Sequence, residues 1–266
     1  MRVQLQNDAN AERFVSQLLD IGNGAVPVED SAHTIVLPGN FCVVVSSEEE
    51  LIQSVFPDLA DNYVNHSWLC GRAILAPRND AVDAINLAIL EAIPGVEEVY
   101  KSVDTVMEVD QIVNFPTEFL NSLDIPGLPP HVLRLKIGAP IMCLRNLDPS
   151  RLCNGTRLAV KHLRKYIIKA TILTGPYQGE DVLLPRIPLR PTDAVVDFNR
   201  LQFPVRPAFA MTINKAQGQT LQQCGIQLED PCFSHGQLYV ACSRVGKPTD
   251  LFVFTRNGRT ANIVYP

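Results

Sequence analysis

The stretch RAILAPRNDAVDAINLAIL, residues 72–90, decides the fold class because its hydrophobic period changes in the middle. The first five residues are an apolar run, which predicts a short buried strand. Asn79 then offers a helix cap, and Val82, Ile85 and Ile89 recur at a spacing that places them on one helical face. A strand followed by a cap and a helix is the repeating unit of a parallel α/β sheet.

The same order of elements precedes this stretch. FCVVV at residues 41–45 predicts a buried strand, and Ser47 and Glu50 have the spacing of a capping box for a helix that ends before Pro57. An amphipathic helix further upstream is expected to end at Gly22. The N-terminal third therefore predicts alternating strands and helices.

Between about residues 116 and 204 the pattern changes to short β segments separated by proline clusters such as IPGLPPH and LLPRIPLRP. No helix is predicted there, and a small β barrel or sandwich inserted in the α/β domain fits this change of period. The α/β order then returns with a strand at AFAMT, a helix at HGQLYVACSR and a strand at DLFVFT.

Charge is distributed unevenly along the 266 residues, whose net charge is −5. Residues 1–130 carry 5 Lys and Arg against 20 Asp and Glu, a net of −15, whereas residues 131–266 carry 18 against 8, a net of +10. One interpretation is that the basic part meets a polyanion. The other is that two oppositely charged regions attract each other.

Seven cysteines, an odd number without any C-x-x-C pair, lie partly within apolar runs and predict reduced, mostly buried thiols. The gaps between Cys224, Cys232, His235 and Cys242 are too irregular for a known metal site, so no metal is expected. No window approaches 18 consecutive apolar residues, and no signal-peptide pattern begins the chain. We therefore expect a soluble, intracellular protein.

Three segments carry a resemblance to a known family. FAMTINKAQGQTL, residues 209–221, ends an apolar strand in amides, hydroxyls and one lysine and resembles motif V of superfamily 1 helicases of the Pif family and its Helitron-transposon relatives. HGQLYVACSRVG, residues 235–246, resembles motif VI, and residues 133–160 are similar to the segment that opens the 2B insertion. RAILAPRNDAVDAIN and YKSVDTV also resemble family segments, so the likeness covers nearly the whole chain.

The resemblance implies an α/β fold: a RecA-like (P-loop NTPase-type) second lobe with a parallel sheet, interrupted by a small SH3-like β barrel. The expected domains are a first part of the RecA-like 2A domain at 1–115, the 2B insertion at 116–204 and a second part of 2A at 205–266. It further implies ATP-driven 5′ to 3′ translocation on single-stranded DNA by a monomeric nuclear protein. ATP and Mg²⁺ would be bound mainly by a first lobe, which would be a partner of this chain.

The sequence departs from the family pattern in one respect. It contains no G-x-x-x-x-G-K-[ST] box, and no apolar strand ends in a paired Asp-Glu that could hold magnesium. Met1-Arg2 resembles the end of the family's motif IV, as though the chain began within that motif. We therefore expect a C-terminal half of a helicase that is inactive alone. The rival is a non-enzymatic module that binds nucleic acid or protein.

Arg244 matches the family's arginine finger, which supplies positive charge as the γ-phosphate departs. Arg2 would be a second γ-phosphate contact, and Gln217 and Gly218 would turn the chain toward the nucleotide. The alternative for Arg244 is a solvated arginine that the helix dipole favours.

The resemblance places Thr212, Asn214 and Lys215 on the DNA backbone. Hydroxyl and amide donors suit phosphate without reading sequence. The family often has His where this chain has Asn214, which keeps a donor and removes titration. The alternative is a polar loop whose Thr and Gln cap the next helix.

In the expected 2B insertion, Asn154-Gly155 indicates a hairpin turn. A basic run with Tyr166 among its cations could contact a strand, or it could be a solvated barrel face; its members are Lys161, Arg164, Lys165 and Lys169. A hydrolase that uses Ser234 and His235 is not favoured, because adjacent residues on one helix point in different directions.

Overall fold

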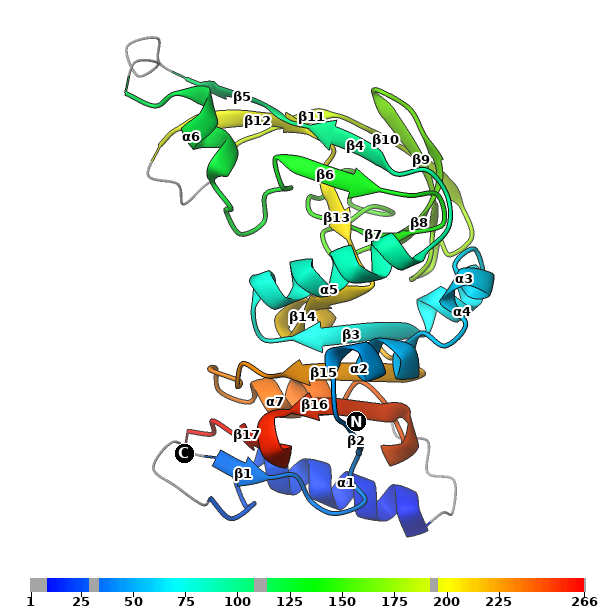
Figure 1. Cartoon of the computed structure of the whole chain (residues 1–266), viewed down its shortest axis with the longest axis vertical. Helices are drawn as coiled ribbons and strands as arrows, with labels where there is room; N and C mark the ends of the chain where they lie inside the picture. The colour runs from blue at the N-terminus through cyan, green and yellow to red at the C-terminus, as the bar shows by residue number, and fades with distance from the viewer. Residues whose placement is uncertain (1–8, 29–33, 108–113, 192–195, 266) are drawn as a thin grey trace. The chain divides into compact units, whose positions relative to one another are not determined.

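The computed structural model describes residues 9–28, 34–107, 114–191 and 196–265 (Figure 1). The chain packs into two compact units. The first, which we call the α/β unit, comprises residues 1–62, 68–89 and 209–266, and the second, the β unit, comprises residues 63–67 and 90–208. Within the described ranges, no helix is long and apolar enough to cross a membrane.

Five parallel strands form the central sheet of the α/β unit, in the spatial order β14-β3-β15-β16-β2 (Figure 1). The strands are β2 (Val43–Val45), β3 (Arg72–Ala76), β14 (Ala210–Thr212), β15 (Gln223–Leu228) and β16 (Leu251–Thr255). β1 (Thr34–Val36) and β17 (Arg259–Ala261) pair separately and antiparallel. The side chains of β3 from Ala73 to Ala76 are all buried, as expected for a parallel strand covered on both faces. The predicted parallel α/β class is therefore confirmed.

Helices cover the two faces of this sheet. α2 leads from β2 to β3 and α7 leads from β15 to β16, so these connections cross the strand order in opposite directions. Right-handed crossovers then place α2 and α7 on opposite faces. The helices are α1 (Ala9–Gly22), α2 (Glu48–Val55), α3 (Leu59–Asn62), α4 (His66–Cys70), α5 (Asn79–Ala92) and α7 (Gln237–Cys242), with 3₁₀ turns η2 (Ile213–Ala216), η3 (Pro248–Asp250) and η4 (Arg256–Gly258).

The N-terminus of α2 carries the predicted capping box. The backbone N–H of Glu50 donates to the Ser47 hydroxyl at 3.1 Å. The Glu50 carboxylate accepts from the backbone N–H of Ser46 at 2.7 Å, so the reciprocal bond reaches one residue further than the expected cap. These bonds fix the start of the helix that packs over β15.

The β unit is built from antiparallel strands. β10-β9-β8-β7-β13 form a five-stranded sheet, β11-β12-β5 a three-stranded sheet, and β4-β6 a two-stranded one. The strands are β4 (Glu98–Lys101), β5 (Val103–Val106), β6 (Val132–Leu135), β7 (Pro140–Cys143), β8 (Arg157–Leu163), β9 (Ile167–Ile172), β10 (Asp181–Pro185), β11 (Ile187–Leu189), β12 (Phe198–Gln202) and β13 (Val205–Pro207). Side chains from seven of these strands share one apolar core, which is consistent with an SH3-like insertion. The predicted domain limits at 115/116 and 204/205 stay predictions.

The expectation of no helix between 116 and 204 is wrong, because α6 spans Thr117–Ser122. Pro116 precedes this helix, and Leu120 is its buried contact with a second small core. A six-residue helix is too short to show a hydrophobic period, and tertiary contacts stabilise it. Those contacts include a hydrogen bond from the buried Arg200, on β12, to the Leu120 carbonyl.

Candidate nucleotide and nucleic-acid site

The carboxyl ends of the five parallel strands share one edge of the sheet, where α/β proteins bind their ligands. Thr212, the last residue of β14, lies opposite Ala76, the last residue of β3. The segments that begin at Ile213 and at Pro77 therefore leave the sheet side by side. We call this edge, with the segments that leave it, the carboxyl edge.

The predicted backbone-binding residues lie on a 3₁₀ turn at this edge. Thr212 is half-buried at its start, and Asn214 and Lys215 are exposed, whereas Ile213 and Ala216 are buried beneath them. Alternation of buried apolar and exposed polar side chains anchors the turn and presents its donors to solvent. This geometry fits the phosphate-binding prediction, although contact with DNA remains a prediction.

The capping alternative for this loop receives partial support. Thr212 stands at the N-cap position of η2, but its side chain makes no capping hydrogen bond. The side-chain amide of Gln219 donates to the Lys215 carbonyl at 3.2 Å and so closes the turn. Gln217 and Gly218, the predicted nucleotide contacts, are exposed, and Gly218 adopts a φ of 84° that favours glycine.

Arg244 follows α7 and holds this same loop. Its Nη1 donates to the carbonyls of Ala216 at 3.2 Å and Gln219 at 3.1 Å. Its Nε donates to the Val240 carbonyl at 2.7 Å, and its Nη2 to the Ser243 hydroxyl at 2.6 Å. These bonds use four of the five guanidinium N–H groups and leave one on Nη2.

The Arg244 backbone takes part as well, since its carbonyl accepts the Leu221 N–H at 2.9 Å. Burial lowers the pKa of the Arg244 guanidinium, while Cys224 and Tyr239 act in the opposite sense. An arginine nevertheless stays charged at neutral pH. Arg244 is therefore a half-buried cation tied to the motif V loop, which a freely solvated arginine would not be.

Arg78 is a cation at the carboxyl edge that sequence reasoning missed. It lies two residues after the end of β3, and its guanidinium lies 3.2 Å from Asp80 Oδ2 and 4.0 Å from Asp230 Oδ2. Asp230 belongs to the segment after β15, so this contact links the ends of two neighbouring strands. Its position just beyond an apolar strand and a proline was the signal that could have identified it.

The other predicted site residues lie elsewhere. Arg2 is outside the described residues. Lys161 lies in the β unit, and its Nζ is 2.9 Å from Asp181 Oδ2, as is that of Lys169. These lysines hold the pKa of Asp181 far below its usual range, so the three form a charged cluster at neutral pH. Lys165, on the tip between β8 and β9, is exposed with its Nζ 5.0 Å from the Tyr166 ring centroid.

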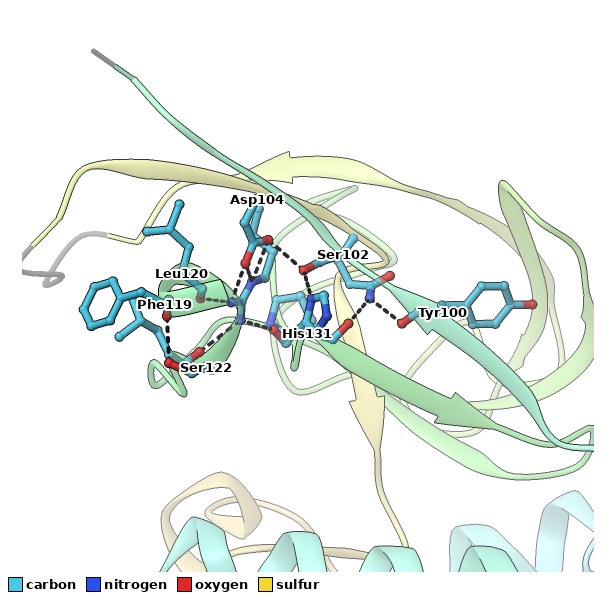
Figure 2. Close-up of polar contacts among 11 residues, drawn as sticks. Tyr100, Ser102, Asp104, Phe119, Leu120, Ser122 and His131 are labelled. Carbon is cyan, nitrogen blue, oxygen red and sulfur yellow. Dashed lines mark hydrogen bonds and ion pairs between the residues drawn. The ribbon is translucent and has the colours of Figure 1, made fainter. Parts of the chain in front are cut away.

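A buried ion pair in the β unit was also missed (Figure 2). Arg200 on β12 lies directly opposite Asp104 on β5, and its Nη2 is 2.7 Å from Asp104 Oδ2. The guanidinium also donates to the carbonyls of Leu120, Leu123 and Pro129 at 2.8, 3.2 and 3.1 Å. Alternation along FNRLQ placed Arg200 on the inward face, which was the available signal. This arginine ties α6 to the sheet.

Ser102 and His131 extend this network (Figure 2). The Ser102 hydroxyl donates to Asp104 Oδ1 at 2.7 Å and lies 2.8 Å from His131 Nδ1. A hydrolytic triad needs the histidine between the serine and the carboxylate, whereas Ser102 occupies the middle. Burial, with smaller effects of Arg200 and Lys101, lowers the pKa of His131 despite Asp104. We interpret the network as structural.

The cysteine prediction is confirmed. All seven are free thiols, and Cys143, Cys224, Cys232 and Cys242 are buried. Burial raises the pKa of the Cys224 and Cys232 thiols to about 12, so both are unreactive at neutral pH. Within the described parts of the chain, no three His, Cys, Asp or Glu side chains gather into a possible metal site.

Comparison with known proteins supports the resemblance. The family described as "DNA helicase Pif1, 2B domain" matches residues 118–163. The ATP-dependent DNA helicase PIF1 of Danio rerio is 30% identical over 174 residues, which are 64% of this chain and 25% of that protein. The chain spans only 16% to 25% of the length of the first curated relatives that it matches.

Two solved structures extend the comparison to the fold. Pif1 helicase from Candida albicans superposes with a TM-score of 0.62 at 27% identity, over 93% of this chain and 54% of that one. Pif1 helicase from Bacteroides in complex with ADP-AlF3 and ssDNA superposes with a TM-score of 0.60 at 21% identity, over 98% of this chain and 52% of that one. The second match is a likeness of fold alone.

A parallel α/β sheet whose chain is interrupted by an antiparallel β unit defines the class of the protein, a RecA-like helicase lobe that carries a 2B-type insertion. The sequence matches then identify the family. The chain is a C-terminal portion of a Pif1-family DNA helicase.

Proposed function

We propose that this chain is the second lobe of an ATP-dependent 5′ to 3′ DNA helicase, with Arg244 as arginine finger and the η2 turn as part of the single-stranded DNA track. The contact of the Arg244 guanidinium with the Ala216 and Gln219 carbonyls carries the proposal. It joins the expected nucleotide-sensing group to the loop that presents Thr212, Asn214 and Lys215. A motor needs such a connection between hydrolysis and its track.

The groups around Arg244 suit the edge of a nucleotide site. The free Nη2 proton and the exposed Gln217 and Gly218 can donate to phosphate oxygens. ATP would supply the γ-phosphoryl group, whose developing charge an arginine stabilises. Because the sequence has no G-x-x-x-x-G-K-[ST] box, a first lobe would cradle the phosphates and hold Mg²⁺.

The proposed DNA contacts act on the backbone. An exposed lysine, an exposed amide and a half-buried hydroxyl on one turn suit phosphates and not base edges. The Bacteroides relative was solved with ssDNA, which supports the same partner for this fold. Binding by this chain should be independent of sequence.

The test measures hydrolysis and binding by the purified chain. We expect no ATP hydrolysis above background, with or without single-stranded DNA, and weak DNA binding with a Kd of about 10⁻⁴ to 10⁻⁶ M at physiological salt. DNA-stimulated turnover by this chain alone would contradict the assignment of nucleotide binding to another lobe. Absence of any DNA binding would contradict the DNA-track assignment.

A second experiment separates the helicase portion from a non-catalytic binding module. A first lobe from a close Pif1-family relative is added or fused, and hydrolysis is measured with DNA. Recovery of turnover that depends on Arg244 supports the proposal. DNA binding without recovered turnover, in a fusion whose first lobe binds ATP, favours the non-catalytic module.

A further inference from the structure

Phe233 is a large apolar side chain displayed to solvent at the carboxyl edge. It is 57% exposed, although it follows the buried Cys232 and precedes the partly buried α7. It lies in the segment between β15 and α7, which leaves the sheet where β15 ends at Leu228. This phenyl ring stands at the edge of the sheet where α/β proteins bind their ligands.

The backbone around Phe233 is fixed, so the ring does not lie on a loose loop. The buried side chain of Gln237 accepts the Phe233 N–H at 3.0 Å and the Ser234 N–H at 3.3 Å through its Oε1. The Gly236 N–H donates to the Ile263 carbonyl at 2.9 Å. A buried amide that holds two consecutive N–H groups fixes the backbone from which the phenyl ring projects, which lowers the entropy cost of ordering this segment on binding.

Further aromatic rings are exposed on the same segment and on the coil that follows β17. The rings of His235 and Tyr265 stack, with centroids 5.6 Å apart and planes at 13°. The Tyr265 N–H donates to His235 Nδ1 at 3.0 Å, and the Tyr265 side chain is 66% exposed. The segment therefore carries flat π faces, while its imidazole is held in place by a backbone bond.

The segment that carries Phe233 begins at the same edge of the sheet as the proposed phosphate contacts. Asp230, three residues before Phe233, lies 4.0 Å from Arg78 at the end of β3. The end of β3 adjoins Thr212 on β14 through their register. Neighbouring strands lie about 4.8 Å apart, so β14 and β15 are separated by about 10 Å. The segment that carries Phe233 therefore leaves the same edge of the sheet as the proposed phosphate donors, two strands away from Thr212.

We propose that Phe233 stacks on unpaired bases of a single strand whose backbone passes Thr212, Lys215 and Arg78, with the His235–Tyr265 pair as a second π surface. The site rests on the proposed function and adds a base-recognising surface to its backbone contacts. Stacking on a phenyl ring requires only the π face that every base has, so it does not select a sequence.

The experiment compares binding of the full chain to two fluorescent oligonucleotides of equal length, one of oligothymidine and one in which the central nucleotides are abasic. Wild type should bind the thymidine strand about tenfold more tightly. Phe233→Ala should remove this preference and leave affinity for the abasic strand unchanged, whereas Phe233→Trp should retain it. Phe119→Ala, which removes an exposed phenyl ring from α6 in the β unit, is the matched control and should behave as wild type.

The outcomes separate the two proposals. Equal binding of both oligonucleotides by wild type, or an unchanged preference in Phe233→Ala, overturns the stacking site while backbone binding stands. Failure of wild type to bind either strand overturns the proposed function together with this inference. If Phe233→Ala proves unstable, Phe233→Leu, which keeps apolar volume and loses the π face, must lose the preference, and retention of it overturns the site.

Discussion

Under the proposed function, Arg244 would have two tasks. As a finger it would contribute charge to a departing phosphate, yet in this structure its guanidinium already binds the carbonyls of Ala216 and Gln219. Withdrawal of the guanidinium toward a nucleotide would release these carbonyls and loosen the turn that carries Lys215. If Arg244 is the finger, the nucleotide state and the hold on DNA would therefore be coupled through a single side chain.

We predict that Arg244→Ala loosens the loop even without nucleotide. Hydrogen bonds to a charged group contribute about 1.5 to 3 kcal/mol, so amide exchange at Gln219 should accelerate by about tenfold or more. Hydrogen–deuterium exchange measures this, and the Leu221 amide is an internal control because its acceptor, the backbone carbonyl of residue 244, is retained. Unchanged exchange at Gln219 would mean that the side chain does not stabilise the loop.

The matched control for this variant is Arg256→Ala. Arg256 also lies at the end of an element, but its side chain is largely exposed, and its Nη2 pairs with Glu229 Oε1 at 2.8 Å. A surface ion pair of this kind contributes little to stability.

In a fusion with a first lobe, Arg244→Ala should reduce the rate of ATP hydrolysis by about 10³ to 10⁵, whereas Arg256→Ala should not. Arg244→Lys should recover little, because lysine lacks the planar fork.

The sequence indicated which residues belong to the candidate site, but it did not indicate which residues contact one another. The resemblance identified Arg244, Thr212 and Lys215 by their motifs, and the fold brings Arg244 to the predicted loop. The pairing of Lys161 with Asp181 could not be predicted, because it depends on the register of β9 with β10 and of β8 with β9. Long-range register is not encoded in a local window.

At the scale of elements, the close approach of α2 to β15 is set by Gly225. A Cβ at this position would lie 2.8 Å from Val55 Cγ2 and 3.1 Å from both Leu51 Cδ1 and Ile74 Cγ1. We predict that Gly225→Ala lowers the free energy of unfolding by about 1 to 3 kcal/mol through overpacking. Urea denaturation followed by circular dichroism measures this change.

Gly39→Ala is the control for this prediction, since a Cβ at Gly39 would meet nothing within 4 Å and no left-handed φ is required there. Its stability should stay within about 0.5 kcal/mol of wild type. Equal stability of Gly225→Ala and wild type would show that α2 moves away from the sheet without cost.

Elements with strong local signals were predictable, and those stabilised by distant residues were not. The strand at Arg72–Ala76 and the capping box of α2 follow from local hydrophobic runs and cap spacing. α6 was not predicted because Arg200, which lies 80 residues beyond Leu120, binds the Leu120 carbonyl within the helix and the Leu123 carbonyl just after it. A helix held by a buried cation has no local signature.

At the scale of the whole molecule, the uneven charge distribution has a specific consequence for binding. The net charge of +10 in residues 131–266 includes lysines of both units, such as Lys215 on η2 and Lys161 on β8. Ion pairing reduces the availability of some of them, since Asp181 binds both Lys161 and Lys169. Formal charge alone therefore does not reveal which unit contacts DNA.

The salt dependence of single-strand binding can assign these contacts. For single strands, log K falls with log salt with a slope of about −0.7 for each phosphate neutralised. Lys215→Ala should weaken binding to every sequence alike and make the slope shallower by about 0.7, because it removes one exposed cation from the track.

If the lysines of the β unit also contact the strand, Asp181→Asn should release Lys161 and Lys169 from their ion pairs, tighten binding and steepen the slope by up to about 1.4. Fluorescence anisotropy at several salt concentrations measures both slopes. An unchanged slope in Asp181→Asn would assign Lys161 to a solvated barrel face, and an unchanged slope in Lys215→Ala would remove η2 from the track.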